Sequence, residues 1–196
     1  MENKDKLAIR VWQSNVTIKE LLNKEETKIF KKLTFLKSGL KMSNIIICPQ
    51  VNISSFADFP KEDKALWDFS NLSVDFLIID NENYKPLMAI EYYGGGHYQG
   101  DEEKRAKIKI RDLCKQILCY KTGIELQIIC FEDIFWRDDK GEAQFKKDAD
   151  LFFEKNIFKK LESVIIGEKQ FLENELKEAQ NYIDYLEAEL TKLANH

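Results

Sequence analysis

The chain has 196 residues, of which 44% are hydrophobic, and it carries a net charge of −4. This length suits one ordinary domain with an appendage, and the composition excludes a disordered, collagen-like or low-complexity chain. No apolar run approaches the roughly 18 residues that span a bilayer, and the charged N-terminus is unlike a signal peptide. We therefore expect a cytoplasmic protein that has no membrane partner.

Cysteine and histidine are too few and too scattered for a zinc site. The chain has four cysteines and two histidines, and no two cysteines form a Cys-x-x-Cys pair. We expect four free thiols, mostly buried, in a reducing compartment.

Residues 17–71 predict one helix, one strand and a connection. Apolar residues recur at three- and four-residue steps over residues 17–37, which is typical of an amphipathic helix, and Ser38-Gly39 is expected to end it. Residues 45–48 are β-branched and predict a short strand. Residues 54–71 are expected to form an irregular or partly helical connection.

The centre of the chain predicts a hairpin followed by a helix. Residues 74–80 and 86–93 read as two strands, and the polar turn of residues 81–83 joins them. Three glycines at positions 94–96 end the second strand. A helix is then expected from about residue 101 to residue 122, with three acidic residues at its start, where the helix dipole favours them.

This helix carries two patterns. An expected apolar stripe consists of Ile110, Leu113, Cys114, Ile117 and Leu118. A basic run consists of Lys104, Arg105, Lys107, Lys109, Arg111 and Lys115. Three members of the run, Lys107, Arg111 and Lys115, are spaced by four residues and share one face. That face could contact phosphates, or it could be simply a solvated face.

The remaining elements complete one domain. Residues 124–131 predict another strand, and residues 143–166 predict another helix. Together the elements indicate an α/β domain over residues 1–167, with a mixed central sheet flanked by helices.

Residues 168–196 predict a separate C-terminal coiled-coil helix. Their apolar residues alternate at four- and three-residue steps for about three heptads. The segment has seven acidic residues and three lysines, so it carries a charge of −4 and leaves residues 1–167 neutral. A parallel homodimer is permitted, because no pair of flanking positions would bring two like charges together. The alternative is that this helix folds back on its own domain.

Two acidic residues interrupt the apolar central strands, Asp75 in the first and Glu91 in the second. A carboxylate in a core strand is costly unless it is paired or bound to a cation. If the adjacent strands bring the two together, Mg²⁺ or Mn²⁺ would relieve their repulsion, and such a metal can activate water against a phosphodiester. The alternative is that both carboxylates face solvent at strand ends. His97, after the glycines, could orient a phosphate or be an ordinary loop histidine.

The motifs occur in a defined order, namely Glu26 in the first helix, Val74-Asp75-Phe76, Ile90-Glu91-Tyr92, Gly94-Gly95-Gly96-His97 and Arg111-Asp112. This order resembles the PD-(D/E)XK, restriction-endonuclease-like superfamily. Within it, the chain is similar to domains related to very-short-patch-repair endonucleases. The resemblance covers roughly residues 22–130.

The resemblance implies a restriction-endonuclease-like fold and a set of site residues. Asp75 and Glu91 would be metal ligands, and Glu26 would be an accessory acid. Tyr93 stands where the superfamily usually has its catalytic lysine. Lysines of the following helix would then replace it, and the candidates are Lys107, Lys109 and Lys115. The phosphate-binding candidates are His97, Arg105 and Arg111.

Two functions are open at this point. One is a Mg²⁺- or Mn²⁺-dependent nuclease that hydrolyses phosphodiester bonds in DNA, with a homodimer through residues 168–196 presenting two sites. The other is a catalytically degenerate nuclease fold, which binds nucleic acid or protein and assembles through its C-terminal helix. The missing lysine and the neutral body favour the second.

Overall fold

The computed structural model describes residues 20–60, 62–167, 170 and 177. Its elements, in chain order, are α2 (Lys24–Gly39), β1 (Ile45–Asn52), the 3₁₀ turn η1 (Ile53–Ser55), α3 (Lys64–Ser70), β2 (Ser73–Asp80), β3 (Pro86–Tyr93), α4 (Glu102–Thr122), β4 (Glu125–Cys130), α5 (Phe131–Ile134), β5 (Phe135–Arg137), β6 (Ala143–Phe145), α6 (Ala149–Phe153) and the π-helical turn η2 (Glu154–Phe158). Residues 159–167 continue the last helix.

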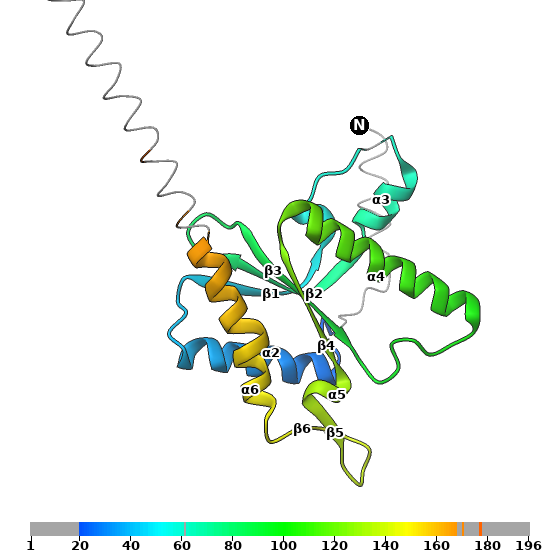
Figure 1. Ribbon diagram of the computed structural model, residues 1–196. Coiled ribbons are helices and arrows are strands. Elements are labelled where there is room, and N and C mark those ends of the chain that lie inside the picture. Colours follow the sequence, from blue (N-terminus) through cyan, green and yellow to red (C-terminus); the bar gives the residue numbers. More distant parts are fainter. Residues whose placement is uncertain (1–19, 61, 168–169, 171–176, 178–196) are drawn as a thin grey trace, which may run out of the picture.

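A mixed four-stranded sheet forms the centre of the molecule. Its strand order is β1-β2-β3-β4, where β1, β2 and β3 pair antiparallel and β4 pairs parallel with β3. The helix α4 makes the crossover between the two parallel strands, and β5 and β6 form a small separate hairpin. The mixed sheet with flanking helices confirms that part of the predicted fold (Figure 1). The restriction-endonuclease-like fold remains a prediction.

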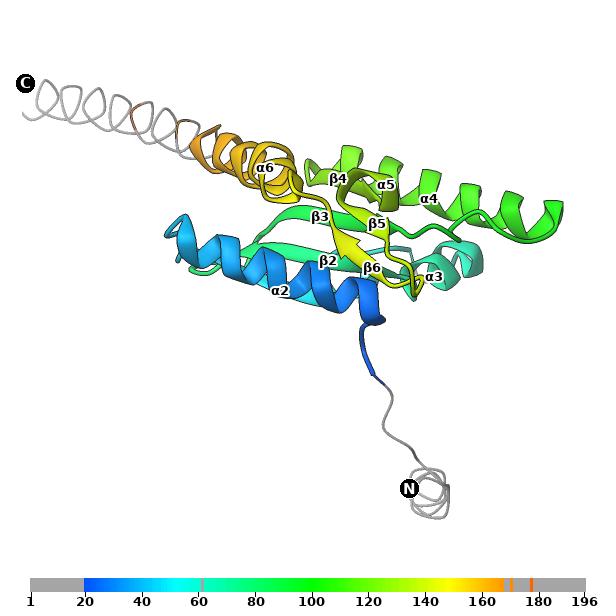
Figure 2. The same cartoon turned by 90° about the horizontal axis from the view of Figure 1, so that it is seen from below.

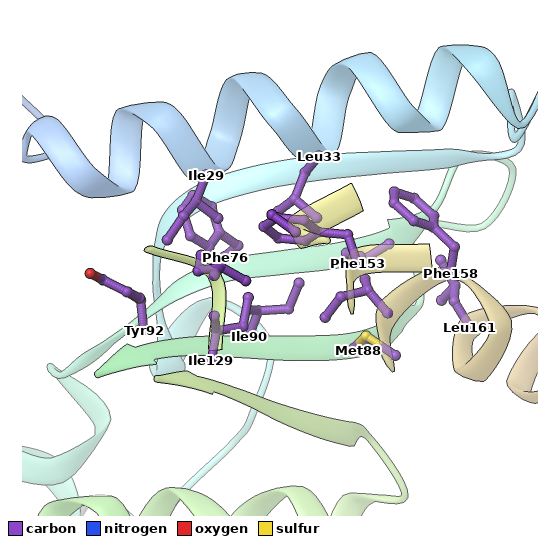
Figure 3. Close-up of a cluster of buried hydrophobic side chains, with 14 of the residues drawn as sticks. Ile29, Leu33, Phe76, Met88, Ile90, Tyr92, Ile129, Phe153, Phe158 and Leu161 are labelled. Carbon is purple, nitrogen blue, oxygen red and sulfur yellow. The ribbon is translucent and has the colours of Figure 1, made fainter. Parts of the chain in front are cut away.

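Helices cover both faces of the sheet. Figure 1 shows α2 and α6 on one side and α4 on the other. The larger core lies on the α2 side, where Ile29 and Leu33 of α2 meet Phe76 of β2 and Phe153 of α6 (Figure 3). Each such side chain contributes about 1.5–3 kcal/mol when fully buried. The face that carries α2 and α6 therefore supplies most of the apolar stabilisation.

The core on the α4 side is smaller. Its buried members are Val74, Leu77, Ala89, Cys119 and Ile124, and no large aromatic ring is among them. Beside it lie the buried charged residues Glu91 and Asp112. This face therefore has fewer apolar contacts and accommodates polar side chains.

Two predicted helices have different boundaries in the structure. The helix predicted from residue 17 begins at Lys24, because Asn23 and Glu26 form a capping box there. The helix predicted over 143–166 begins only at Ala149. Residues 143–145 instead pair with β5, which places Phe145 opposite Phe135. A short aromatic segment of this kind is indistinguishable from the end of an amphipathic helix by spacing alone.

The predicted apolar stripe of α4 is directed largely toward solvent and not toward the sheet. Ile110, Leu113 and Ile117 are exposed, and the residues of α4 that are buried are Asp112 and Cys119. The physical reason is that α4 lies over the acidic end of β2 and β3, so its polar face forms the inward contacts.

The predicted C-terminal coiled coil lies outside the described residues, apart from two isolated positions. Within the described part of the chain, no helix combines the length and the apolar character that crossing a bilayer requires.

Candidate active site

The register of β2 and β3 places the two predicted metal ligands on one face of the sheet. Phe76 pairs with Ile90 and Leu77 with Ala89, so one further step sets Asp75 opposite Glu91. Residues directly opposite each other in an antiparallel pair project to the same side. The backbone N–H of Tyr92 donates to Asp75 Oδ2 at 2.7 Å. The two carboxylates thus come from adjacent strands and face α4.

Lys115 of α4 reaches this pair from the layer above. Its Nζ donates to both Glu91 carboxylate oxygens at 2.8 Å. The pair is largely buried, with 5% of the Glu91 side chain and 13% of the Lys115 side chain exposed. The other two candidate lysines lie elsewhere, since Lys107 pairs with Glu103 on the helix surface and Lys109 is exposed.

Gln50 connects Asp75 to the first helix. Its Nε2 donates to Asp75 Oδ1 at 3.2 Å and, more weakly, to Glu26 Oε2 at 3.5 Å. Ser73 Oγ donates to Gln50 Oε1 at 3.1 Å, which fixes the amide orientation. The backbone of Gln50 has φ 49°, in the left-handed region that is costly for a residue with a side chain. Such strain persists where surrounding contacts hold it, often at functional sites.

His97 is held in place by Asp112 and by the ring of Tyr93. Its Nε2 lies 2.9 Å from Oδ2 of the buried Asp112, which also accepts from the Tyr98 hydroxyl at 3.0 Å. The ring of Tyr93 stacks on the imidazole, with 3.9 Å between centroids and 9° between planes. The loop histidine is therefore a positioned side chain, and Asp112 and Tyr93 position it.

These groups surround one pocket of about 330 Å³. Its lining residues are Glu26, Leu72, Ser73, Asp75, Glu91, Tyr92, His97, Ile108, Arg111, Asp112 and Lys115. Six of the nine predicted site residues are among them. Arg105, Lys107 and Lys109 are exposed on α4 and do not line the pocket.

Burial disfavours the charged forms of three pocket carboxylates, those of Glu91, Asp75 and Glu26. Burial, with a further contribution from the Asp75 charge, raises the pKa of Glu91 to about 7, although Lys115 opposes the shift. Burial also raises the pKa of Asp75 against the hydrogen bond from Tyr92, and raises the pKa of Glu26, where the Asp75 charge adds to the effect. A cation in the pocket would relieve this cost.

Tyr93, at the end of β3, supplies no charge to the pocket. Burial, followed by the nearby Asp112 charge, raises the pKa of Tyr93 far above its ordinary value. The phenol therefore stays protonated at neutral pH. The ammonium group of this pocket comes instead from Lys115.

Asp75 and Glu91 are the side chains of this pocket that could hold a hard divalent cation. Among the residues that the structure describes, no group of three or more His, Cys, Asp or Glu side chains is arranged to hold a metal ion. Mg²⁺, however, is usually bound through one or two carboxylates, with water and substrate phosphate completing its shell. Asp75 and Glu91 provide such a pair, provided that Lys115 releases one oxygen of Glu91.

The sequence alone did not indicate the roles of three residues of this site. Gln50 follows a proline in a strand and has no pattern that marks it. Tyr93 stands out in the sequence only as the residue in place of a lysine, and in the structure it is the stacking partner of His97. Asp112 had a signal, because it is the lone acid within a run of basic residues.

The fold and the pocket define a mixed α/β protein with a buried acidic site that contains one lysine. The chain belongs to the family described as a protein of unknown function, DUF2726, which matches residues 18–134. That range contains every pocket-lining residue and ends before β5.

One curated relative extends this comparison. It is an uncharacterized protein of Haemophilus influenzae that is 33% identical over 107 residues, which is 54% of this chain and 51% of the relative. The chain thus spans about half the length of the relative it matches. No solved structure gives a significant match.

Proposed function

We propose that the chain is a Mg²⁺- or Mn²⁺-dependent nuclease-like protein that hydrolyses phosphodiester bonds in DNA. The observation that carries this proposal is the meeting of Asp75, Glu91 and Lys115 in one pocket, from three different elements. Two carboxylates and an ammonium are the groups that the resemblance to PD-(D/E)XK enzymes requires. The lysine comes from the helix after the strand and not from the strand itself.

Each pocket residue has a role in this proposal. Asp75 and Glu91 would hold the cation, which when bound polarises a phosphodiester and lowers the pKa of a water molecule. Lys115 would supply an ammonium group that is largely buried, and a buried charge stabilises charge on a phosphate more strongly than the same charge in bulk solvent. Arg111, at the same pocket wall, adds a bidentate donor for phosphate oxygens.

The histidine and its partners supply a proton-transfer group. With the Nε2 proton directed at Asp112, the Nδ1 lone pair of His97 is left to accept a proton. The stacked Tyr93 ring limits rotation of the imidazole. Asp112 therefore acts as a positioning residue for His97.

The basic surface of α4 supports a polyanionic substrate. Lys104 and Arg111 are exposed on the side of α4 that carries Lys115, and Arg111 lines the pocket. Basic side chains at the rim of the pocket attract phosphates without regard to base sequence. A homodimer assembled through residues 168–196 would bring two pockets together, which cleavage of both strands requires.

Plasmid cleavage with added Mg²⁺ or Mn²⁺ tests the function. We expect nicking or linearisation by the wild-type chain, and loss of that activity in Asp75→Ala and in Glu91→Ala. Glu103→Gln, which changes an exposed carboxylate of α4, is the matched control and should keep the activity. Absence of cleavage in the wild type, or survival of cleavage in both alanine variants, contradicts the proposal.

A second candidate is a catalytically degenerate module that binds nucleic acid or protein. The observation that favours it is the engagement of both Glu91 oxygens by Lys115, which is how a buried pair is satisfied without a metal. Salt-sensitive DNA binding without cleavage, unaffected by Asp75→Ala, would indicate this function.

A further inference from the structure

The outward face of α4 carries a stripe of apolar side chains without a cover among the described residues. Its members are Ile110, Leu113, Ile117 and Tyr120, with 61%, 54%, 49% and 88% of their surface exposed. Their spacing of three, four and three residues places them on one side of the helix. That side points away from the sheet, because Asp112 and Cys119 face the sheet. A contiguous exposed apolar stripe of this kind marks an interaction surface.

Basic residues flank this apolar stripe on both sides. At 100° per residue, Arg105 and Lys109 lie along one side, and Lys107 and Lys121 along the other. All four are exposed. Over its whole length α4 has seven basic and three acidic residues, so its net charge is +4. A segment that binds this surface should carry an apolar stripe of its own with acidic residues beside it.

Residues 168–196 of this chain have that composition. Their apolar residues repeat at the same three- and four-residue steps as the stripe on α4, and their charge is −4. At about 1.5 Å per residue a helix of this length reaches roughly 40 Å, which exceeds the roughly 30 Å of α4. Apolar spacing, charge and length therefore agree.

The direction in which the described chain ends favours binding of residues 168–196 to α4 of a second copy over binding to α4 of the same copy. Residues 159–167 pack beside the start of β4, where Lys160 Nζ lies 3.0 Å from Gln127 Oε1 and 3.5 Å from Glu125 Oε1. Figure 2 shows the last described turns running away from α4 of the same chain. Gly167 continues the helix and does not have the positive φ of a chain reversal. The described chain therefore ends pointing away from its own α4.

We propose that residues 168–196 of one copy pack along the exposed apolar face of α4 in a second copy, and that the exchange is reciprocal. The result is a closed, two-fold symmetric homodimer. Pairing the two C-terminal segments with each other would instead bring together two segments of charge −4. Pairing each with α4 brings −4 against +4, which favours the exchanged arrangement. This dimer does not depend on whether the pocket is catalytic.

Isotope-resolved photo-cross-linking tests whether the apolar stripe of α4 binds the C-terminal segment of a second copy or that of the same chain. Full chains that carry a photoreactive phenylalanine at Ile117 are made in ¹⁴N and ¹⁵N form, mixed in equal amounts, equilibrated and irradiated. We expect cross-linked peptides between position 117 and residues 168–196, of which about half combine one ¹⁴N and one ¹⁵N peptide. Cross-links that join only peptides of the same isotope indicate docking within one chain and overturn the proposal. So do cross-links that avoid the C-terminal segment.

A pair of matched variants tests the contribution of the stripe to assembly. Ile117→Glu places a charge in the stripe, and Gln116→Glu places the same charge at the neighbouring exposed position off the stripe. By sedimentation of the full chain, we expect the first to weaken the dimer at least tenfold and the second to change it less than threefold. A monomeric wild type, or a dimer that Ile117→Glu leaves unchanged, overturns the proposal. Unaltered circular dichroism shows that both variants fold.

Discussion

The helix α4 buries a mainly polar face and exposes an apolar one, which is the reverse of an ordinary surface helix. The face toward the sheet carries Asp112, Lys115 and Cys119, whereas the face toward solvent carries the exposed apolar stripe. An amphipathic helix usually buries its apolar face. The inward face of α4 is instead held by a salt bridge to Glu91 and by hydrogen bonds to the His97 loop. The polar contacts of the pocket, and not an apolar face, therefore hold much of this helix against the sheet.

This difference has an energetic consequence. The apolar core beneath α4 is small, so breaking one buried polar contact there removes a large part of what holds the helix. Removal of one partner from a buried ion pair typically costs 3–5 kcal/mol, because the other charge is left uncompensated. The outward face makes no such contact within the described residues. The variants below separate the two faces.

The largest effect is expected for Lys115→Met on the inward face. The variant removes the ammonium group of the pocket, so cleavage of plasmid in Mg²⁺ should fall about 10²–10³-fold. The measurement is the initial nicking rate at saturating metal. Lys159→Met, at an exposed position of the last helix, is the control and should keep the wild-type rate. A Lys115→Met rate within threefold of wild type would remove Lys115 from the reaction.

A pH-dependent effect on stability is expected from Glu91. Its pKa is about 7 in the folded chain, above the ordinary value of 4.5. Between these values the folded state holds a proton that the unfolded state has lost. The stability that this proton provides is present below pH 4.5 and is lost as the pH rises through about 7. The Glu91 contribution amounts to at most about 3 kcal/mol.

Urea titrations at pH 5, 6, 7 and 8 measure this dependence. The free energy of unfolding of the wild type should decline over that range, and the decline should be smaller in Glu91→Gln. Glu103→Gln should follow the wild type. If Glu91→Gln and the wild type decline in parallel, Glu91 is ionised throughout the range.

A moderate effect is expected for Asp112→Ala. The substitution leaves His97 and the Tyr98 hydroxyl without their shared acceptor, which should lower the free energy of unfolding by about 1–3 kcal/mol. Asp112→Asn keeps an acceptor oxygen and should recover part of that loss. Urea denaturation measures the stability, and the NMR resonance of the His97 ring reports on its position. An unchanged His97 signal in Asp112→Ala would contradict the positioning role.

The smallest effect is expected on the outward face. Leu113→Ser removes an exposed apolar side chain, so at concentrations where the chain is monomeric its free energy of unfolding should change by less than about 0.5 kcal/mol. Thermal unfolding of dilute protein measures it. A loss above about 2 kcal/mol would mean that the stripe is buried within the monomer, and the contrast between the two faces would fail.

The sequence identified the strands of the site better than the helix above it. Two apolar runs joined by a polar turn suffice to place β2 and β3, and the two carboxylates stand out because they interrupt those runs. The spacing in α4 defines an apolar face but not the direction in which that face points. Only the direction in which each face of α4 points decides which of Lys107, Lys109 and Lys115 reaches the site. That direction is seen in the structure, where Lys115 lies over Glu91.

Other parts of the site depend on contacts between segments distant in the chain. Gln50 lies 25 residues from Asp75, and the residue at this left-handed position is neither glycine nor asparagine, so the sequence does not indicate the conformation. Asp112 is recognisable only as an isolated acid, and its hydrogen bond to His97 requires the loop to turn back over α4.

Tyr92 connects the two faces of the sheet through a single residue. Its ring packs edge-on against Phe135 in the larger core, its hydroxyl donates to Glu25 of α2 at 2.7 Å, and its backbone N–H donates to Asp75. Because the backbone N–H cannot move without the ring, the rigidity of the larger core is transmitted to the Asp75 carboxylate. Mutations in the larger core, for example at Phe135, would therefore make the Asp75 carboxylate more mobile although they do not contact it.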